Sequence, residues 1–312
     1  MQGLFAFAGQ GPSSTAGVFV SPSASQSILI TALALREMGA RRVAVPNPTY
    51  GKIPEILRLS GLSAVAFSEG TVDEVIEELS GISQVDAVVL AMPNNPTGWM
   101  LDQEPFLRLS EYLARAGSVL VADLAYRWFS PVMSAFSQYD TLARSGVRHV
   151  IIEDTGKVLP AGGFKLSTIA SCEGCQPALR RVCATLTRHL PRHQLETFAA
   201  LWAQRAIAEY LTVATATVRE NRELAVSRLA NFGWRPVTTP GISTQMFEIP
   251  NADDSLFISL RAKGVYVLPS VFFYWDQPRH VPAIRITLLH RRSVFNCLLG
   301  DLERAVVELD RV

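Results

Sequence analysis

This sequence lacks an excess of charge of either sign, long apolar runs and abundant cysteine. Its 312 residues carry 29 Lys plus Arg against 28 Asp plus Glu, so the formal net charge is +1 at pH 7. No basic stripe with interleaved aromatic residues is present, so we expect no nucleic-acid partner. The apolar run SILITALAL is too short to cross a membrane and is followed by Arg36 and Glu37. We therefore expect no membrane partner either.

Signals for export and for metal binding are also lacking. The N-terminal stretch MQGLFAFAGQGPSSTAG has no basic start and no clear cleavage site, so we expect a cytoplasmic protein. Only four cysteines occur, of which Cys172 and Cys175 form a C-x-x-C. That spacing allows a redox pair or half of a metal site. No second pair or histidine cluster accompanies it, which favours ordinary reduced thiols, and we expect no metal.

What the sequence does contain is a regular alternation of helical and strand patterns. Hydrophobic residues make up 48% and charged residues 18%, as in a globular protein with a sizeable core. Amphipathic helical patterns cover 24–38, 51–60, 72–81 and 103–115, with Ser21 or Ser23 as the first cap. Apolar strand patterns cover 41–46, 64–67, 86–93, 118–126 and 149–157. This alternation predicts an α/β fold with a mostly parallel sheet sandwiched by helices.

The second half of the chain has a different pattern. A long helical stretch over about 194–230 is expected to link two domains. Shorter strand patterns at 244–250, 265–270 and 283–289, and an amphipathic helix near 292–309, follow it. We predict a large α/β domain over 1–205 and a smaller C-terminal α+β domain over 206–312.

Polar side chains gather where the apolar strands end. Asn95 follows one strand within Asn-Asn-Pro-Thr-Gly, Asp123 and Tyr126 end the next, and Lys157 follows another. Parallel strands bring such residues to one edge of the sheet, where ligands bind. A lysine can form a Schiff base with an aldehyde, and an aspartate can pair with a protonated pyridine nitrogen. Together with phenol and amide donors for a phenolate oxygen, this set suits pyridoxal 5'-phosphate.

Four motifs in order carry a resemblance to a known family. They are NNPTG at 94–98, DLAY at 123–126, GKVLPAGGFK at 156–165 and RITLL at 285–289. They resemble the fold-type I pyridoxal-phosphate enzymes, specifically the class I/II aminotransferase family, over about residues 20–290. The resemblance implies that Lys157 forms the Schiff base and moves the proton, and that Asp123 contacts the pyridinium nitrogen. It also implies that Asn95 and Tyr126 contact the ring oxygen and that Tyr50 stacks on the ring.

The same resemblance assigns a phosphate end and a substrate contact. Ser23, Ala24 and Ser25 begin the first helix, whose free N–H groups suit a phosphate. Thr155 and Lys165 are expected to bind the phosphate too, and Arg285 to bind the substrate carboxylate. Each of these positions also has an ordinary structural explanation, such as a cap, a turn, a core tyrosine or a surface salt bridge.

Three features depart from the family pattern. Asp154 stands where a phosphate-binding Ser or Thr is usual, and Lys165 stands where Arg is usual. The first phosphate loop, SPSAS, has no glycine and begins near residue 21, so the segment that normally precedes it is absent or replaced by 1–20. These departures leave the substrate open.

The expected function is transfer of an amino group between an amino acid, or a related amine, and a keto acid. A specialised biosynthetic pathway would fit. Other pyridoxal-phosphate reactions on the same fold, by a lyase, racemase, decarboxylase or cyclising synthase, remain alternatives, as does a non-catalytic binding relative. We expect a homodimer, with the aromatic run SVFFYW at 270–275 either at the subunit boundary or in the small-domain core.

Overall fold

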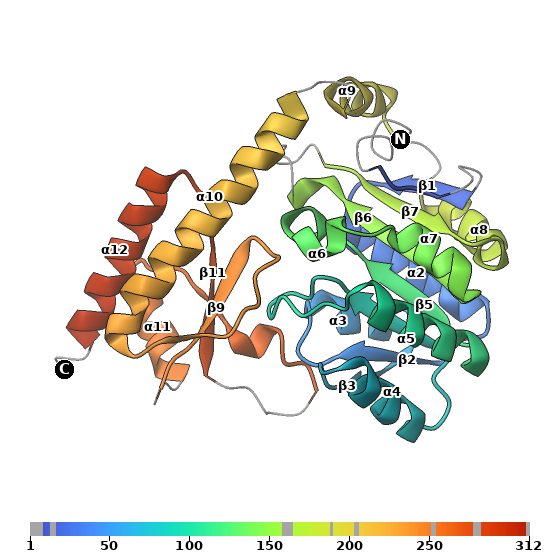
Figure 1. Cartoon of the computed structure of the whole chain (residues 1–312), viewed down its shortest axis with the longest axis horizontal. Helices are drawn as coiled ribbons and strands as arrows, with labels where there is room; N and C mark the ends of the chain where they lie inside the picture. The colour runs from blue at the N-terminus through green and yellow to red at the C-terminus, as the bar shows by residue number, and fades with distance from the viewer. Residues whose placement is uncertain are drawn as a thin grey trace.

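Two sheets of different size organise the chain (Figure 1). The computed structural model describes residues 9–12, 17–157, 165–187, 190–202, 206–250, 254–276 and 282–309. In these residues a seven-stranded sheet is built from the first half of the chain and a four-stranded sheet from the second half.

The large sheet is mostly parallel, as predicted. Its strands run in the order β1-β7-β6-β5-β4-β2-β3. Neighbours from β3 to β6 pair in parallel, whereas β7 pairs antiparallel with both β6 and β1. The strands are β1 (Val18–Ser21), β2 (Arg42–Pro46), β3 (Ser63–Phe67), β4 (Ala87–Ala91), β5 (Val119–Asp123), β6 (Arg148–Asp154) and β7 (Ser167–Ser171). The carboxyl ends of β2, β4, β5 and β6 therefore lie along one edge.

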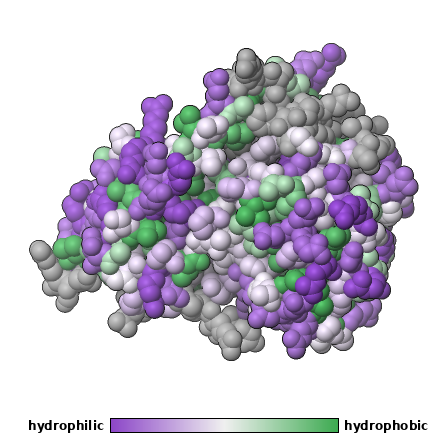
Figure 2. Space-filling model, viewed as in Figure 1, coloured by the Kyte–Doolittle hydropathy of each residue, from purple (hydrophilic) through white to green (hydrophobic). Residues whose placement is uncertain are grey.

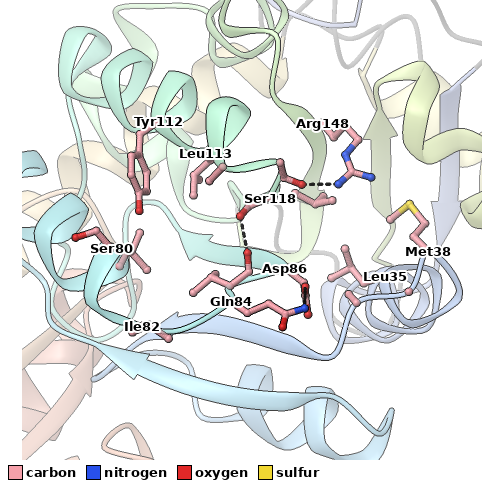
Figure 3. A pocket seen from close by; sticks show the side chains of 17 residues that line it. Leu35, Met38, Ser80, Ile82, Gln84, Asp86, Tyr112, Leu113, Ser118 and Arg148 are labelled. Carbon is pink, nitrogen blue, oxygen red and sulfur yellow. Dashed lines mark hydrogen bonds between the residues drawn. The ribbon is translucent and has the colours of Figure 1, made fainter.

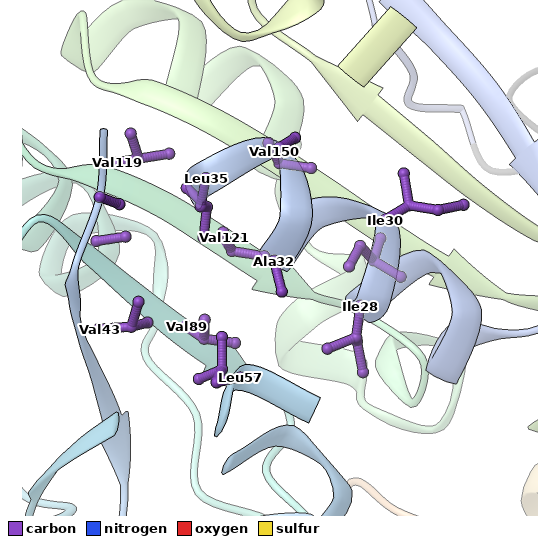
Figure 4. Close-up of a cluster of buried hydrophobic side chains, with 14 of the residues drawn as sticks. Ile28, Ile30, Ala32, Leu35, Val43, Leu57, Val89, Val119, Val121 and Val150 are labelled. Atoms are coloured by element: carbon purple, nitrogen blue, oxygen red, sulfur yellow. The ribbon is translucent and has the colours of Figure 1, made fainter. Parts of the chain in front are cut away.

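Helices cover both faces of this sheet, because its strands are apolar on both sides. One face packs against α2 (Ala24–Glu37), α3 (Lys52–Leu59) and α8 (Gln176–Leu186). Figure 4 shows part of this layer, where Ile28 and Leu35 of α2 lie over the valines of the sheet. The other face packs against α4 (Val72–Gly81), α5 (Gln103–Ala116) and α7 (Gln138–Ser145). The sheet is thus rigidly held, and its polar edge is free to build a site.

The smaller sheet packs against long helices. Its strands are β8 (Arg235–Pro236), β9 (Thr244–Glu248), β10 (Leu268–Pro269) and β11 (Ala283–Thr287), in the order β10-β11-β9-β8. The surrounding helices are α10 (Ala206–Leu229), α11 (Asp254–Ala262) and α12 (Arg292–Leu309), and α9 (Arg192–Trp202) precedes them. The core of this part also contains Tyr126 and Phe129, which come from the loop after β5. The two halves therefore share apolar contacts next to the expected site.

Most predicted elements are present within a residue or two of their predicted ends. Of the two expected caps, Ser21 and Ser23, it is Ser23 that caps α2, since its hydroxyl accepts a hydrogen bond from the N–H of Gln26. Strands β1 and β7 were not predicted, and the strand expected over 265–270 is reduced to β10. The long helical stretch consists of α9 and α10, and residues 203–205 between them lie outside the described residues. The domain boundary at 205/206 falls there and stays a prediction.

The outer surface is mostly hydrophilic on the face shown in Figure 2, and hydrophobic side chains appear there in small separate groups. Among the described helices, none has the length and apolar character needed to cross a lipid bilayer.

Candidate active site

The predicted polar residues converge on one cavity at the carboxyl edge of the large sheet. Of the predicted site residues, those that line it are Ser23, Ala24, Ser25, Tyr50, Asn95, Asp123, Tyr126, Lys157 and Lys165, and Asp154 joins them. Asp123 and Asp154 are the last residues of β5 and β6, and the others lie at the N-terminus of α2 or in segments that follow β2, β4, β5 and β6. Two predicted residues, Thr155 and Arg285, are not part of this lining. Residues 158–164 of the lysine motif lie outside the described residues.

The start of α2 is fixed by a chain of serine hydroxyls. Ser21 bonds to Ser27 at 2.8 Å and also donates to the carbonyl of Ser23 at 2.9 Å. Ser27 in turn bonds to Ser167 of β7 at 2.8 Å. These buried bonds hold the helix against the sheet without a glycine in the turn. Ser23, Ala24 and Ser25 at the start of α2 line the cavity, where the helix dipole favours an anion.

Asp123 is a deeply buried acid of the cavity, with 6% of its surface exposed. Burial raises the pKa of its carboxyl to about 6, the N–H of Ala125 lowers it, and Asp154 nearby raises it further. The Ala125 N–H donates to Asp123 Oδ1 at 3.1 Å. The charge of Lys157 also lowers the pKa, but burial outweighs both effects. A cationic partner at the carboxylate would therefore stabilise it further.

Lys157 and Tyr126 lie together on the next loops. The Lys157 Nζ atom is 5.6 Å from the centroid of the Tyr126 ring. Tyr126 is the main cause of a raised pKa at Lys157, which burial opposes and Asp154 supports. The free lysine is therefore an ammonium at neutral pH in this arrangement. It must lose a proton before its amine can attack an aldehyde.

Asp154 and Lys165, the two cavity residues that differ from the family pattern, lie close together. Asp154 accepts the N–H of Gly156 at 2.8 Å, and burial raises the pKa of its carboxyl. Lys165 lies opposite, with its side chain against Gly156, and its charge opposes that rise. The hydroxyl of Thr155 donates to the Leu166 carbonyl at 2.8 Å and accepts the Leu166 N–H at 3.0 Å. Thr155 thus has backbone partners, and Lys165 is a cation close to Asp154.

Arg285 reaches the site from the smaller sheet. Its Nη1 donates to Asn95 Oδ1 at 2.9 Å, and its guanidinium lies 5.0 Å from the Phe273 ring centroid. Burial lowers its pKa, although Tyr126 and Tyr50 nearby oppose this. Within the described part of the chain, the buried Nε has no hydrogen-bond partner. An arginine with an unused donor beside Asn95 is suited to an oxygen anion.

The loop that carries Asn95 depends on a residue that the sequence analysis missed. Glu69, after β3, accepts hydrogen bonds from Asn94 and from Thr97, the latter at 2.6 Å. Burial raises the pKa of Glu69 to about 7, although these hydrogen bonds oppose the rise. Asn94 is fully buried and also accepts the Thr49 hydroxyl at 2.8 Å. No local pattern predicts this contact, because Glu69 lies 25 residues before Asn94.

Gly98 shows why the loop ends as it does. Its φ is 74°, a conformation that other residues rarely adopt, and a Cβ there would lie 2.0 Å from the Thr239 carbonyl oxygen. Thr239 donates its N–H to the Thr97 carbonyl at 2.6 Å, and the Thr238 hydroxyl donates to the Pro96 carbonyl at 2.9 Å. The loop therefore both presents Asn95 to the cavity and docks the C-terminal part of the chain.

A second cavity lies at the opposite edge of the sheet (Figure 3). It has a volume of about 480 Å³ and contains none of the predicted site residues. Arg148 donates to the Gly117 carbonyl at 2.5 Å, and Asp86 Oδ2 accepts two backbone N–H groups, from Arg41 and Arg42. Arg148 and Asp86, the charged side chains of this cavity, therefore already hydrogen-bond to backbone groups of the protein.

Known sequences resemble this chain over most of its length. The family model "Aminotransferase class I and II" matches residues 4–296. A histidinol-phosphate aminotransferase of Chlorobium luteolum is 26% identical over 261 residues, which is 81% of this chain and 68% of the relative. One from Escherichia coli O1:K1 is 33% identical over 38% of this chain and 33% of its own length. A threonine-phosphate decarboxylase of Sinorhizobium sp. is 26% identical over 51% of this chain and 44% of its own.

Solved structures agree with the fold. MppP soaked with the product 2-ketoarginine matches with a TM-score of 0.83 and 26% identity, over 96% of this chain and 86% of that one. The aspartate aminotransferase of Thermus thermophilus with maleate matches with a TM-score of 0.82 and 19% identity, over 97% and 80%. The fold-type I prediction is therefore confirmed. The chain belongs to the class I and II aminotransferase family, whose members are transferases that use pyridoxal 5'-phosphate.

Proposed function

We propose that this chain binds pyridoxal 5'-phosphate through Lys157 and transfers the amino group of an amino acid, or a related amine, to a keto acid. The observation that carries the proposal is the convergence of Lys157, Asp123, Asn95 and Tyr126 on one cavity. An amine, a buried carboxylate, an amide and a phenol are the groups that this cofactor needs around its ring.

The donor set fits the cofactor at most of its positions. The start of α2 and Lys165 would hold the phosphate, Asp123 the ring nitrogen, and Asn95 and Tyr126 the ring oxygen, while Tyr50 would stack on the ring. Asp154 is the exception, because a carboxylate beside a phosphate is repulsive. Lys165 offsets it in part, as a point charge. When bound, the cofactor supplies an aldehyde for amines and an electron sink for the bond that breaks at the substrate Cα.

The residues of this chain would then share the remaining work. Lys157 Nζ would take the proton from the substrate Cα and return it to the cofactor carbon, acting as base and then as acid. Asp123 would keep the ring nitrogen protonated, and the raised pKa of its buried carboxyl supports this role, since a cation beside it would relieve the cost of burial. Arg285 would orient the substrate by its carboxylate, from a place next to Asn95.

The test of this function is conversion of the cofactor by a panel of amino acids. Purified protein loaded with pyridoxal phosphate is expected to lose its visible absorbance band when the right amino acid is added without an acceptor. A keto acid should form in the same amount, and adding a second keto acid should restore the band. Loading without any visible band would contradict the cofactor assignment.

Arg285 gives a sharper prediction about the substrate. Arg285→Lys keeps the positive charge but loses the planar fork, so we expect the KM for the amino acid to rise about tenfold or more, with a smaller change in kcat. Steady-state kinetics with the active amino acid measure this.

Arg235→Lys is the matched control, because Arg235 lies in the same sheet and pairs with Glu248 with 70% of its side chain exposed. Its kinetics should equal those of the parent. An unchanged KM in Arg285→Lys would remove Arg285 from substrate binding.

Decarboxylation is the second candidate. A threonine-phosphate decarboxylase is among the relatives, and Asp154 and Lys165 depart from the aminotransferase pattern. The two reactions differ in product, since decarboxylation releases carbon dioxide and leaves an amine, whereas transamination leaves a keto acid. Trapping the carbon dioxide in the panel experiment separates them.

Assembly and location stay predictions. A homodimer is supported by Phe272 and Val271, which are 60% and 49% exposed although Phe273 beside them is buried. A cytoplasmic location rests on the sequence alone.

A further inference from the structure

The C-x-x-C pair lies at the sheet edge remote from the cavity. Cys172 directly follows β7, and Cys175 ends a short 3-10 helix (Glu173–Cys175) that leads into α8. Strands β6 and β7 run antiparallel, and their length separates the pair from the cavity. Asp154, which lines the cavity, pairs with Ser167 at one end of β7, whereas Ser171, next to Cys172, pairs with Val150 at the other end. The proposed amino-group transfer therefore makes no use of these two thiols.

The two sulfur atoms are already in contact. Cys172 Sγ lies 3.7 Å from Cys175 Sγ, and all four cysteines of the chain are free. Cys172 is half-buried, so a small reagent can reach it, whereas Cys175 is buried, with none of its surface exposed. In thiol–disulfide exchange the accessible cysteine attacks the external disulfide and the buried one resolves the intermediate. Cys172 and Cys175 differ in accessibility in this way.

The surroundings favour a thiolate on Cys172. The N–H of His149 donates to Cys172 Sγ at 3.2 Å. The hydrogen bond between Cys172 and Cys175 is the main cause that lowers the pKa of the Cys172 thiol to about 5. The same contact raises the pKa of the Cys175 thiol. Cys172 immediately precedes the short 3-10 helix that leads into α8, an eleven-residue helix whose N-terminus adds positive potential. Cys172 is therefore the nucleophile of the pair, and Cys175 is the thiol that resolves the mixed disulfide.

We propose that Cys172 and Cys175 form a thiol–disulfide exchange site for low-molecular-weight disulfides. The Cys172 thiolate attacks one sulfur of the external disulfide, forms a mixed disulfide and releases one thiolate. Cys175 then loses its proton to solvent and attacks Cys172 Sγ, and the second external thiolate leaves. Two protein thiols are oxidised to one disulfide, and one external disulfide is reduced to two thiols.

The experiment uses oxidised glutathione and mass spectrometry of the full-length protein with its cofactor. Cys297 is exposed and would form its own adduct, so all proteins carry Cys297→Ser. The protein with both pair cysteines should become lighter by two hydrogen atoms and keep no adduct. Adding Cys175→Ser should leave one stable glutathione adduct on Cys172, because nothing resolves it. Adding Cys172→Ser instead should leave Cys175 unmodified, because it is buried.

Two results would overturn the proposal. One is a stable adduct on Cys172 when Cys175 is present, and the other is no reaction at Cys172 in the Cys175→Ser protein.

Alkylation provides a second readout, since the hydroxyl introduced by Cys175→Ser keeps a hydrogen-bond donor beside Cys172. The first protein carries Cys175→Ser and Cys297→Ser and retains Cys172. The reference protein carries Cys172→Ser and Cys175→Ser and retains Cys297. At a pH of about 6, Cys172 in the first protein should react with iodoacetamide about tenfold or more faster than Cys297 in the reference protein. Equal rates would show that Cys172 is an ordinary thiol and would contradict its role as the nucleophile.

Discussion

Lys157→Ala is expected to abolish the visible absorbance band of the loaded protein and to lower the rate of amino-group transfer by about 10³-fold or more. Lys157 is the lysine that we propose to form the covalent link to the cofactor, and its Nζ lies 5.6 Å from the centroid of the Tyr126 ring. Lys165 is the other lysine in the described cavity lining. Without Lys157, the lining lacks the amine that we propose as the base at the substrate Cα. Absorbance after loading and single-turnover rates measure the two losses separately.

The control for this variant is Lys52→Ala. Lys52 is an exposed lysine that pairs with Glu55 on α3, away from the cavity lining. It should load and react as the parent does. If Lys157→Ala kept the band, another lysine would hold the cofactor, and Lys165 would be the first to replace by alanine.

The edge of the sheet was predictable because its residues sit at fixed places in a repeating pattern. Asn95, Asp123 and Lys157 each follow or end an apolar strand, and parallel pairing of β4, β5 and β6 brings their ends together without further information. Ser23 was predictable for a similar local reason, since a serine before an apolar helix is a cap. These predictions needed only the strand and helix periods.

Contacts between distant segments were not predictable in this way. Glu69 supports Asn94 across 25 residues, and Arg285 reaches Asn95 across 190. The place of Thr155 beside Leu166 depends on the antiparallel strand β7, which the pattern did not reveal because Ser167–Ser171 is short and only partly apolar. Such pairings are set by tertiary packing, and one sequence carries no local signal for them.

Asp123→Asn is expected to lower the rate of amino-group transfer by about 10²-fold or more while leaving the visible band in place. The amide can still hydrogen-bond the ring nitrogen but does not carry the charge that keeps it protonated, so the electron sink weakens. Lys157, the proposed Schiff-base lysine, is unchanged in this variant, so we expect the cofactor still to bind. Loss of the band together with the rate would instead assign Asp123 to cofactor retention.

The same substitution should have the opposite effect on the stability of the cofactor-free protein. The pKa of Asp123 in the folded protein is raised to about 6 from its ordinary value of 3.8, so the folded state binds the proton more tightly and stability from this group falls as pH rises through that window. Above about pH 6 the full cost of the buried charge is present, on the order of 3 kcal/mol. Urea unfolding at pH 8 should therefore show Asp123→Asn to be more stable than the parent.

The gain should shrink toward pH 5, where the parent carboxyl takes up its proton in the folded state. Asp140→Asn, which removes an exposed carboxylate at the start of α7, should change stability little at either pH. If Asp123→Asn were instead less stable than the parent at pH 8, the buried carboxylate would be contributing to the fold. If replacing Asp123 both stabilises the cofactor-free protein and slows the reaction, the residue is kept for the cofactor. A cationic group of the cofactor would offset the cost of burying the carboxylate.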